Sequence, residues 1–120
     1  RFYSGTASMK LVSIKANSQF TIKKTIGSEN STGKTNLTFA IQSETSIPSL
    51  NFKVRLLNGT GGALANVRLK SYGPLTLNPN TWYQYSIPLS ALKGLNKELS
   101  GVRFTFSKTG TYYIDELKLQ

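Results

Sequence analysis

Hydrophobic and polar residues alternate with a period of two along most of this chain, and helical periodicity is nearly absent. In the segment 50–57, for example, Phe52 and Val54 share one face while Lys53 and Arg55 share the other. One dry and one wet face are expected of strands in antiparallel sheets that pack over a single core. We therefore predict strands at eight places along the chain: 8–15, 19–26, 35–43, 50–57, 64–71, 82–89, 101–107 and 111–119.

Residues that favour turns separate these predicted strands. The segment 58–62 reads Asn-Gly-Thr-Gly-Gly, tolerates positive φ and predicts a hairpin between its two neighbours. A polar loop is predicted at 28–33, and Gly and Pro residues mark a long connection at 73–80. Only 89–99 has the spacing of a helical turn or two. About eight short strands in one small domain predict an all-β fold, an antiparallel two-sheet β-sandwich of the jelly-roll type.

Length and composition narrow the possibilities further. A chain of 120 residues has the size of one domain, and we interpret residues 1–120 as a single module cut from a longer protein. The chain has no Cys and no His, which excludes a disulfide scaffold, a Cys or His metal site and a His-dependent catalytic triad. No apolar run approaches the ~20 residues needed to cross a bilayer, so we expect no membrane insertion.

The acidic residues give little support for catalysis. Polysaccharide-cleaving enzymes usually need two carboxylates about 5–10 Å apart. Asp115 and Glu116 are adjacent in a predicted strand, so we expect them to point to opposite faces. A Ser–Lys pair stays open in principle, but no spacing singles one out, and no glycine-rich phosphate loop is present. We therefore predict that the protein is not an enzyme.

The basic residues form a clearer pattern, and the net charge is +10. Lys53 and Arg55 share the wet face of one predicted strand, and Asn66, Arg68 and Lys70 share the wet face of its predicted hairpin partner. If the hairpin is direct, these five side chains form one contiguous patch. Because the forked guanidinium of arginine suits a carboxylate or sulfate, we predict that this patch binds an acidic ligand. A solvated face of a cation-rich domain is the alternative interpretation.

Aromatic residues supply candidates for stacking on a ligand. Trp82 begins a predicted strand, where it could bind ligand or seal the end of the sandwich. Tyr72 lies in a Ser-Tyr-Gly-Pro turn and Tyr112 follows Gly110, so we expect both to be exposed. Most phenylalanines fall on apolar stripes and are predicted to lie in the core, namely Phe20, Phe39, Phe52, Phe104 and Phe106.

Several segments together resemble one known family. Residues 80–90 read Asn-Thr-Trp-Tyr-Gln-Tyr-Ser-Ile-Pro-Leu-Ser, a turn, a Trp, an alternating strand and an Ile-Pro-Leu-Ser exit. Residues 99–106 and 110–119 follow, and 4–11 supplies a Gly-x-x-Ser stretch near the start. This succession resembles the β-jelly-roll, galactose-binding-like carbohydrate-binding modules that are appended to secreted glycoside hydrolases. The resemblance implies non-catalytic polysaccharide binding outside the cell.

The chain departs from that family near its beginning. Such modules usually carry a further acidic strand before the Gly-x-x-Ser stretch, and the edge left without it could be covered by a preceding segment or another chain. The family often holds a structural calcium between that strand and an Asp that Asp115 matches here. Asp115 is therefore the metal-ligand candidate, although calcium takes six to eight oxygens. The alternative interpretation is an Asp that accepts backbone donors at a bulge.

Three hypotheses about function follow. The first is a carbohydrate-binding module that attaches a parent protein to a polysaccharide, with acidic or cell-wall glycans favoured by the charge over neutral oligosaccharides. The second is a structural or adhesive β-sandwich that pairs with another protein through an open edge strand. Specific nucleic-acid binding ranks third, because the basic residues are spread over many strands and no predicted helix presents a basic face.

Overall fold

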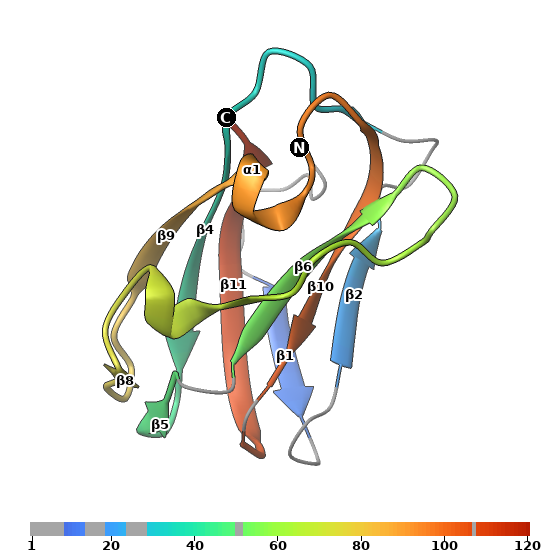
Figure 1. Cartoon of the computed structure of the whole chain (residues 1–120). Coiled ribbons are helices and arrows are strands. Elements are labelled where there is room, and N and C mark those ends of the chain that lie inside the picture. Colours follow the sequence, from blue (N-terminus) through green and yellow to red (C-terminus); the bar gives the residue numbers. More distant parts are fainter. Residues whose placement is uncertain (1–8, 14–18, 24–28, 50–51, 107) are drawn as a thin grey trace.

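Eleven strands and two short helices make up the part of the chain that the structure, a computed structural model, describes: residues 9–13, 19–23, 29–49, 52–106 and 108–120. Sheet A has the order β1 (Met9–Ser13), β11 (Gly110–Leu119), β4 (Asn36–Ser43), β9 (Tyr83–Pro88) (Figure 1). Sheet B has the order β2 (Gln19–Lys23), β10 (Glu98–Thr105), β6 (Lys53–Asn58), β7 (Val67–Arg68), and β3 (Glu29–Asn30) also pairs with β10. A small ribbon joins β5 (Ile47–Pro48) to β8 (Thr76–Leu77), and the helices are the 3₁₀ helix η1 (Leu69–Ser71) and α1 (Leu89–Leu92).

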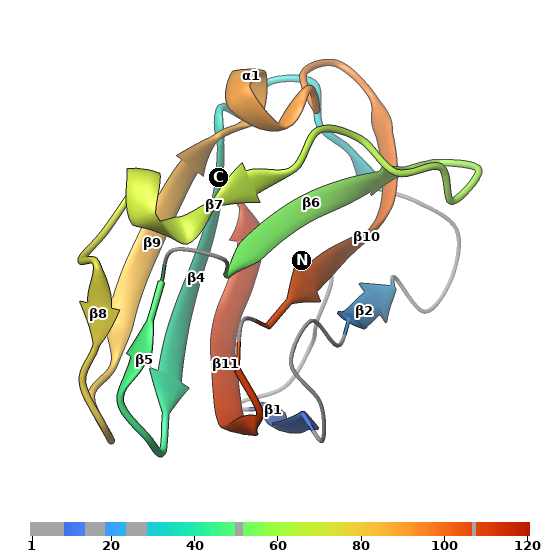
Figure 2. The same ribbon diagram turned by 60° about the horizontal axis from the view of Figure 1, so that its bottom comes forward.

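The inner faces of the two sheets share one hydrophobic core. Strand β4 alternates as predicted, so that Leu37, Phe39 and Ile41 are buried. Phe39 stacks on Tyr85 of the same sheet with ring centroids 5.4 Å apart, and it meets Phe104 of sheet B edge-on at 5.2 Å. Phe39 therefore ties the sheets together. Figure 2 shows the strands of the two sheets in two layers. This confirms the predicted antiparallel two-sheet β-sandwich, built from more and shorter strands than the eight expected.

A second aromatic cluster lies in the same core. Tyr112 stacks on Phe106 with centroids 4.4 Å apart, and Phe52 packs edge-on against both rings. The Tyr112 side chain is 0% exposed, its hydroxyl donates to the Lys108 carbonyl, and burial raises its pKa to about 12. The prediction that Tyr112 is exposed is wrong, because Tyr112 shares the inward direction of Ile114 two positions later.

The predicted strand 64–71 is largely wrong. Within it, the ladder with β6 is limited to Val67–Arg68, although the Leu64 amide also donates to the Leu56 carbonyl at 2.9 Å, and the next three residues turn into η1. That turn buries Leu69 completely, and the Leu69 amide donates to the Phe52 carbonyl at 2.9 Å. Burying a leucine side chain is worth about 1.5–3 kcal/mol, which favours an inward turn over a longer edge strand.

Other element boundaries also differ from the prediction. The predicted loop 28–33 contains β3, and the connection 73–80 contains β8. In the segment 89–99 the helix is limited to α1, because Lys93 takes a left-handed conformation (φ 60°) that ends it, and β10 begins at Glu98. The turn at 58–62 is confirmed: the Asn58 amide donates to the Gly62 carbonyl at 2.8 Å, and β6 and β7 are antiparallel.

Phe20 is an exception to the predicted core. Its partner in register is the buried Phe104, but 36% of Phe20 is exposed. Strand β2 lies at an edge of sheet B, where a side chain is covered from one side only. The prediction that Phe20 lies in the core is therefore wrong. None of the described helices has the length and apolar character that a membrane-spanning helix needs.

Candidate functional site

The outer face of sheet A carries polar side chains from three adjacent strands. Thr38 of β4 lies between Ser86 of β9 and Lys118 of β11, since these residues are partners in register. One row further along, Ala40 lies between Gln84 and Asp115 in the same way. Because alternate residues of a strand share a face, these side chains point away from the core together.

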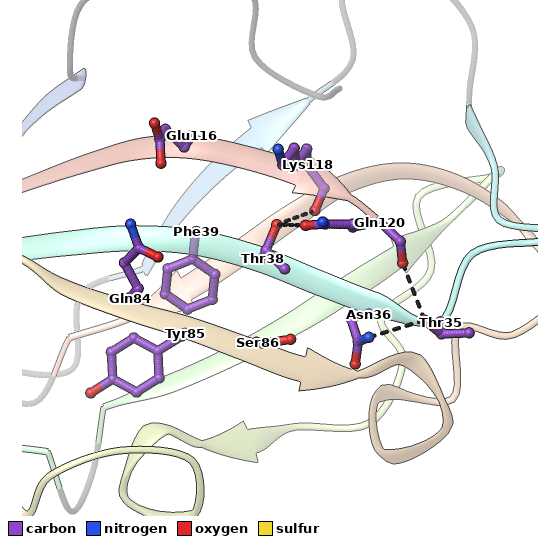
Figure 3. Close-up of a pocket in the computed structure, with 10 residues that line it drawn as sticks. All are labelled: Thr35, Asn36, Thr38, Phe39, Gln84, Tyr85, Ser86, Glu116, Lys118 and Gln120. Atoms are coloured by element: carbon purple, nitrogen blue, oxygen red, sulfur yellow. Dashed lines mark hydrogen bonds between the residues drawn. The ribbon is translucent and has the colours of Figure 1, made fainter.

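This face is hollowed. A hollow of about 430 Å³ opens over β4, β9 and β11, and most of the residues around it are polar (Figure 3). The residues that line it are Thr35, Asn36, Thr38, Phe39, Gln84, Tyr85, Ser86, Glu116, Lys118 and Gln120. A concave site with several convergent polar groups is the usual form of a small-molecule or glycan site. We call it the sheet A hollow.

Hydrogen bonds within the protein fix the side chains at one end of the hollow. Other side chains that line it are free to bind a ligand. Asn36 Nδ2 donates to Thr35 Oγ1 at 3.0 Å, and Thr35 Oγ1 donates to the Gln120 carbonyl at 3.3 Å. Within the described part of the chain, no hydrogen bond involves the side chain of Gln84 or Ser86. An amide and a hydroxyl can both donate and accept, so these two side chains can pair with either partner of a ligand hydroxyl.

A β-bulge places an extra carboxylate at the hollow. The register of β11 against β4 shifts by one residue between Asp115 and Lys118, and Glu116 has a φ of 54°. Both Asp115 and Glu116 therefore stay on the solvent side, while Leu117 is buried. The prediction that the two acids point to opposite faces is wrong, because the bulge adds one residue to the alternation.

The predicted metal ligand, Asp115, makes a hydrogen bond to the backbone within the same bulge. Asp115 Oδ1 accepts the Glu116 amide at 2.8 Å, which is the backbone role considered above as the alternative. Calcium takes six to eight oxygens, usually with several carboxylates, and no group of three or more His, Cys, Asp or Glu that could hold a metal occurs among the described residues. These residues do not supply the ligand set by themselves, and the structural calcium remains a prediction.

Two aromatic side chains extend the face beyond the hollow. Trp82 precedes β9, is 43% exposed, and lies one position before Tyr83, which faces Ile41. Tyr113 lies beside Gln42 in register and is half-buried. Its hydroxyl donates to Glu44 Oε2 at 2.7 Å, and this hydrogen bond raises its pKa. Trp82 is among the predicted ligand-binding residues, whereas Tyr113 is not. Because side chains alternate along a strand, the buried position of Tyr112 would have indicated that Tyr113 faces outward.

The predicted basic residues lie on another surface, the outer face of sheet B. Lys53 and Arg68, predicted on neighbouring strands of a hairpin, are direct partners across β6 and β7. Arg55 faces Arg103 of β10, a residue that was not predicted to belong to the patch. Arg103 Nε donates to Thr21 Oγ1 at 3.1 Å. Arg103 alternates with Phe104 in the predicted strand 101–107, but the pairing of β10 with β6 could not be derived from the sequence.

The remaining predicted patch residues are not on paired strands. Asn66 is exposed in the connection before β7, and Lys70 is half-buried in η1. Arg55 is partly engaged, because its Nε donates to the Leu64 carbonyl at 2.8 Å and its Nη2 donates to the same oxygen. After the 58–62 turn the chain stays beside β6, since the Leu64 amide donates to the Leu56 carbonyl at 2.9 Å and Val67 pairs with Val54. The patch of five residues stays a prediction.

Tyr72, predicted to be exposed, packs against the hydrophobic core and is half-buried. The neighbouring Gly73 approaches the ring of Tyr85 so closely that a Cβ would lie 2.6 Å from it. The close approach draws the turn against the sandwich, which explains why the prediction for Tyr72 is wrong.

Comparison with known proteins gives structural matches only. No protein-family model and no curated protein match the sequence. A family 30 carbohydrate-binding module has a TM-score of 0.72 at 13% identity, over 98% of this chain and 78% of that one. A family 11 module from Clostridium thermocellum, in complex with a β-1,3-1,4-mixed-linked tetrasaccharide, has a TM-score of 0.57 at 14% identity, over 93% and 74%.

A larger protein also matches. The β-1,2-glucanase from Parabacteroides distasonis has a TM-score of 0.72 at 17% identity over 93% of this chain. The match spans only 18% of the glucanase. At such identities the likeness shows the fold: the chain has the β-sandwich fold of solved carbohydrate-binding modules.

Proposed function

We propose that this protein is a non-catalytic carbohydrate-binding module that holds a polysaccharide on the outer face of sheet A, outside the cell. The observation that carries the proposal is the sheet A hollow, where Gln84 and Ser86 are available for hydrogen bonding, beside the exposed Trp82. The fold it shares with solved carbohydrate-binding modules supports the same conclusion.

The chemistry of this face suits a sugar chain. A pyranose has an apolar C–H face, which the 43%-exposed ring of Trp82 can cover, and equatorial hydroxyls, which amide, hydroxyl and carboxylate side chains can bind. From Asn36 to Gln42 the face extends over six residue steps along β4, about 20 Å at 3.3 Å per step. That length accommodates several linked sugars rather than a single one.

The residues of the hollow favour a neutral glycan. Glu116 and Lys118 are the charged residues that line it, and their opposite charges offset each other, so the hollow offers a uronate no net attraction. Two matched structures concern β-linked glycans by name, a β-1,2-glucanase and a module in complex with a β-1,3-1,4-mixed-linked tetrasaccharide. We therefore propose a neutral β-glucan as the ligand of the hollow. Preference for acidic glycans is a separate proposal, supported by the charge of +10, and it concerns surfaces outside the hollow.

A binding role rather than hydrolysis is supported by the two neighbouring carboxylates. Asp115 is held by the amide of Glu116, and the two acids are consecutive on one side of a strand. A glycosidase instead places its carboxylates on both sides of the scissile bond. The matched structures that are well covered in both directions are non-catalytic modules.

Isothermal titration with soluble β-1,3-1,4-glucan tests the proposal. Trp82→Ala should weaken binding about 30-fold or more, the size expected for a central aromatic contact. Gln84→Ala should weaken binding by a smaller factor. Leu95→Ala is the matched control, because Leu95 is also 43% exposed but lies after α1, and its affinity should equal that of the wild type. Equal affinities in all four proteins, or no binding to any β-glucan, would contradict the proposal.

The edge-pairing alternative is favoured by one observation. Strand β2 lies at an edge of sheet B, and its Phe20 is 36% exposed. The unpaired backbone groups of an edge strand can pair with a strand of another chain, which would also cover an exposed apolar side chain. Light scattering at rising concentration tests this: dimers that disappear in Phe20→Ser would support pairing through β2, and a monomer at all concentrations would contradict it.

A further inference from the structure

Four cationic side chains occupy adjacent positions on the outer face of sheet B. Arg103 faces Arg55 across β10 and β6, and Lys53 faces Arg68 across β6 and β7. Lys53 and Arg55 are two positions apart on β6, so the two pairs form neighbouring rows. Directly opposed side chains have their Cβ atoms about 5 Å apart, and like charges at that distance destabilise the sheet. We call these four residues the sheet B basic cluster.

No carboxylate balances the cluster. Of the five acids in the chain, Glu44, Asp115 and Glu116 belong to sheet A or follow β4. Glu29 lies in β3, and Glu98 is the first residue of β10, five positions and about 16 Å along the strand from Arg103. The repulsion within the cluster therefore has no internal partner to offset it.

Two of the arginines are held in place by neutral acceptors. Arg55 donates to the Leu64 carbonyl, and Arg103 donates from Nε to Thr21 Oγ1. A guanidinium has five N–H donors, and these bonds use one or two of them. The remaining donors are oriented rather than mobile, which lowers the entropy lost when they bind an anion. Neutral acceptors also leave the positive charge intact.

The cluster suits an anionic polysaccharide better than a nucleic acid. The outward positions of β2, β10 and β6 beside the cluster hold Gln19, Thr21 and Thr105, and no aromatic ring lies among them for bases to stack on. The cluster lies on strands, with no helix to enter a groove. Carboxylate or sulfate groups need only the charged, forked donors that are present.

We propose that the sheet B basic cluster is a second ligand site, which binds the carboxylate or sulfate groups of an anionic polysaccharide independently of the sheet A hollow. The site goes beyond the β-glucan binding proposed above, because it lies on the other sheet. With both sites occupied, one domain would join a neutral glycan to an anionic one.

Affinity titration with polygalacturonate, which carries carboxylates, and dextran sulfate, which carries sulfates, tests this proposal, with uncharged dextran as the blank. The double variant Arg68→Gln/Arg103→Gln should bind at least one of the two polyanions at least tenfold more weakly than the wild type at physiological salt. Lys93→Gln/Lys97→Gln is the matched control: it removes the same charge from exposed positions after α1 and should lose less than twofold. Arg68→Lys/Arg103→Lys should restore only part of the affinity, because lysine lacks the fork.

Several results would overturn the proposal. Equal losses in the double variant and its matched control would mean that net charge alone attracts the polymer. Tighter binding of duplex DNA than of either polyanion at the same salt would mean that the ligand is a nucleic acid rather than an anionic polysaccharide. No binding of either polyanion by the wild type would remove the site. Because β-glucan binding is measured separately with the Trp82→Ala variant, failure here leaves the function proposed for the hollow intact, and the reverse also holds. Circular dichroism of each variant verifies its fold.

Discussion

The outer faces of the two sheets have the same architecture and opposite chemistry. Both consist of antiparallel strands with a buried inner side, and both present polar rows to solvent. The face of sheet A has a hollow, available amides and hydroxyls, and the acids Asp115 and Glu116. The face of sheet B has opposed cations and no acid beside them. A single core thus supports two surfaces that suit different ligands.

The difference shows that a site depends on which groups remain available, as well as on which residues are present. On sheet B, Arg55 spends part of its hydrogen-bonding capacity on the Leu64 carbonyl. On sheet A, the bulge satisfies its own backbone through Asp115 and leaves Glu116 exposed. Charge alone would have selected the basic face, whereas shape and available donors favour the hollow.

The largest effect that would break this comparison is expected from inserting one alanine between Glu116 and Leu117. The bulge already holds one extra residue, and a second one reverses the alternation in the last part of β11, so that Leu117 and Leu119, now 0% and 5% exposed, turn toward solvent. At 1.5–3 kcal/mol for each buried leucine, the free energy of unfolding should fall by about 3–6 kcal/mol. Urea denaturation followed by Trp82 fluorescence measures it. Deletion of Glu116 is the control, because it restores regular alternation with both leucines inward; an unchanged midpoint in the insertion variant would mean that the bulge absorbs a further residue without a change of register.

The periodicity of the sequence was sufficient to predict much of the fold, but it predicted fewer of the residues in the candidate sites. It placed the cores of β4, β6 and β10 because side chains of a strand alternate regardless of tertiary context. It failed at Glu116, where a non-glycine residue takes positive φ and no turn residue marks the bulge. It also failed at Arg103, whose neighbours depend on long-range register. The hollow required that register as well, since its residues come from three strands far apart in sequence.

The next effect separates the structural and the binding roles of the arginines on sheet B. Arg55→Ala should lower the free energy of unfolding by about 1–3 kcal/mol, because the Leu64 carbonyl loses a charged donor. Arg68→Ala, at an exposed position, should change it by less than about 0.5 kcal/mol. Denaturant titration of both variants checks the difference. Equal, small changes would show that the Arg55 bond contributes nothing to the fold and that Arg55 is as available as Arg68.

A smaller effect tests the strain on sheet A. Glu116→Gly should raise the free energy of unfolding by about 0.5 kcal/mol, since the ~1–2 kcal/mol penalty of the left-handed conformation outweighs the entropy cost of glycine. Glu116→Gln keeps the strain and loses only the charge, so its stability should match the wild type within about 0.5 kcal/mol. If both variants gain equally, repulsion between Asp115 and Glu116 explains the gain rather than backbone strain. Both should bind β-glucan more weakly, because each loses the carboxylate acceptor.

The smallest expected effect is on the coupling between the faces. Two packed sheets lie about 10 Å apart, so the outer side chains of one are further than that from those of the other. At physiological salt the Debye length is about 8 Å, which leaves the two sites electrostatically separate. A neutral β-glucan on sheet A should therefore change the affinity for the anionic polymer on sheet B by less than twofold. Titrating each polymer into protein saturated with the other measures the coupling from both directions, and linkage requires the same factor in each.

A pull-down makes that independence visible in one step. Beads that carry the anionic polymer should retain labelled β-glucan only when the wild-type protein is present. Trp82→Ala and Arg68→Gln/Arg103→Gln should each abolish retention, the first by losing the glucan and the second by losing the bead. Competition between the two polymers instead of joint retention would mean that both bind one continuous surface around the edge of the sandwich. Edge strands β1 and β2 would then be the place to look, since each ends its sheet. The opposite charges of the two faces would in that case tune one site rather than define two.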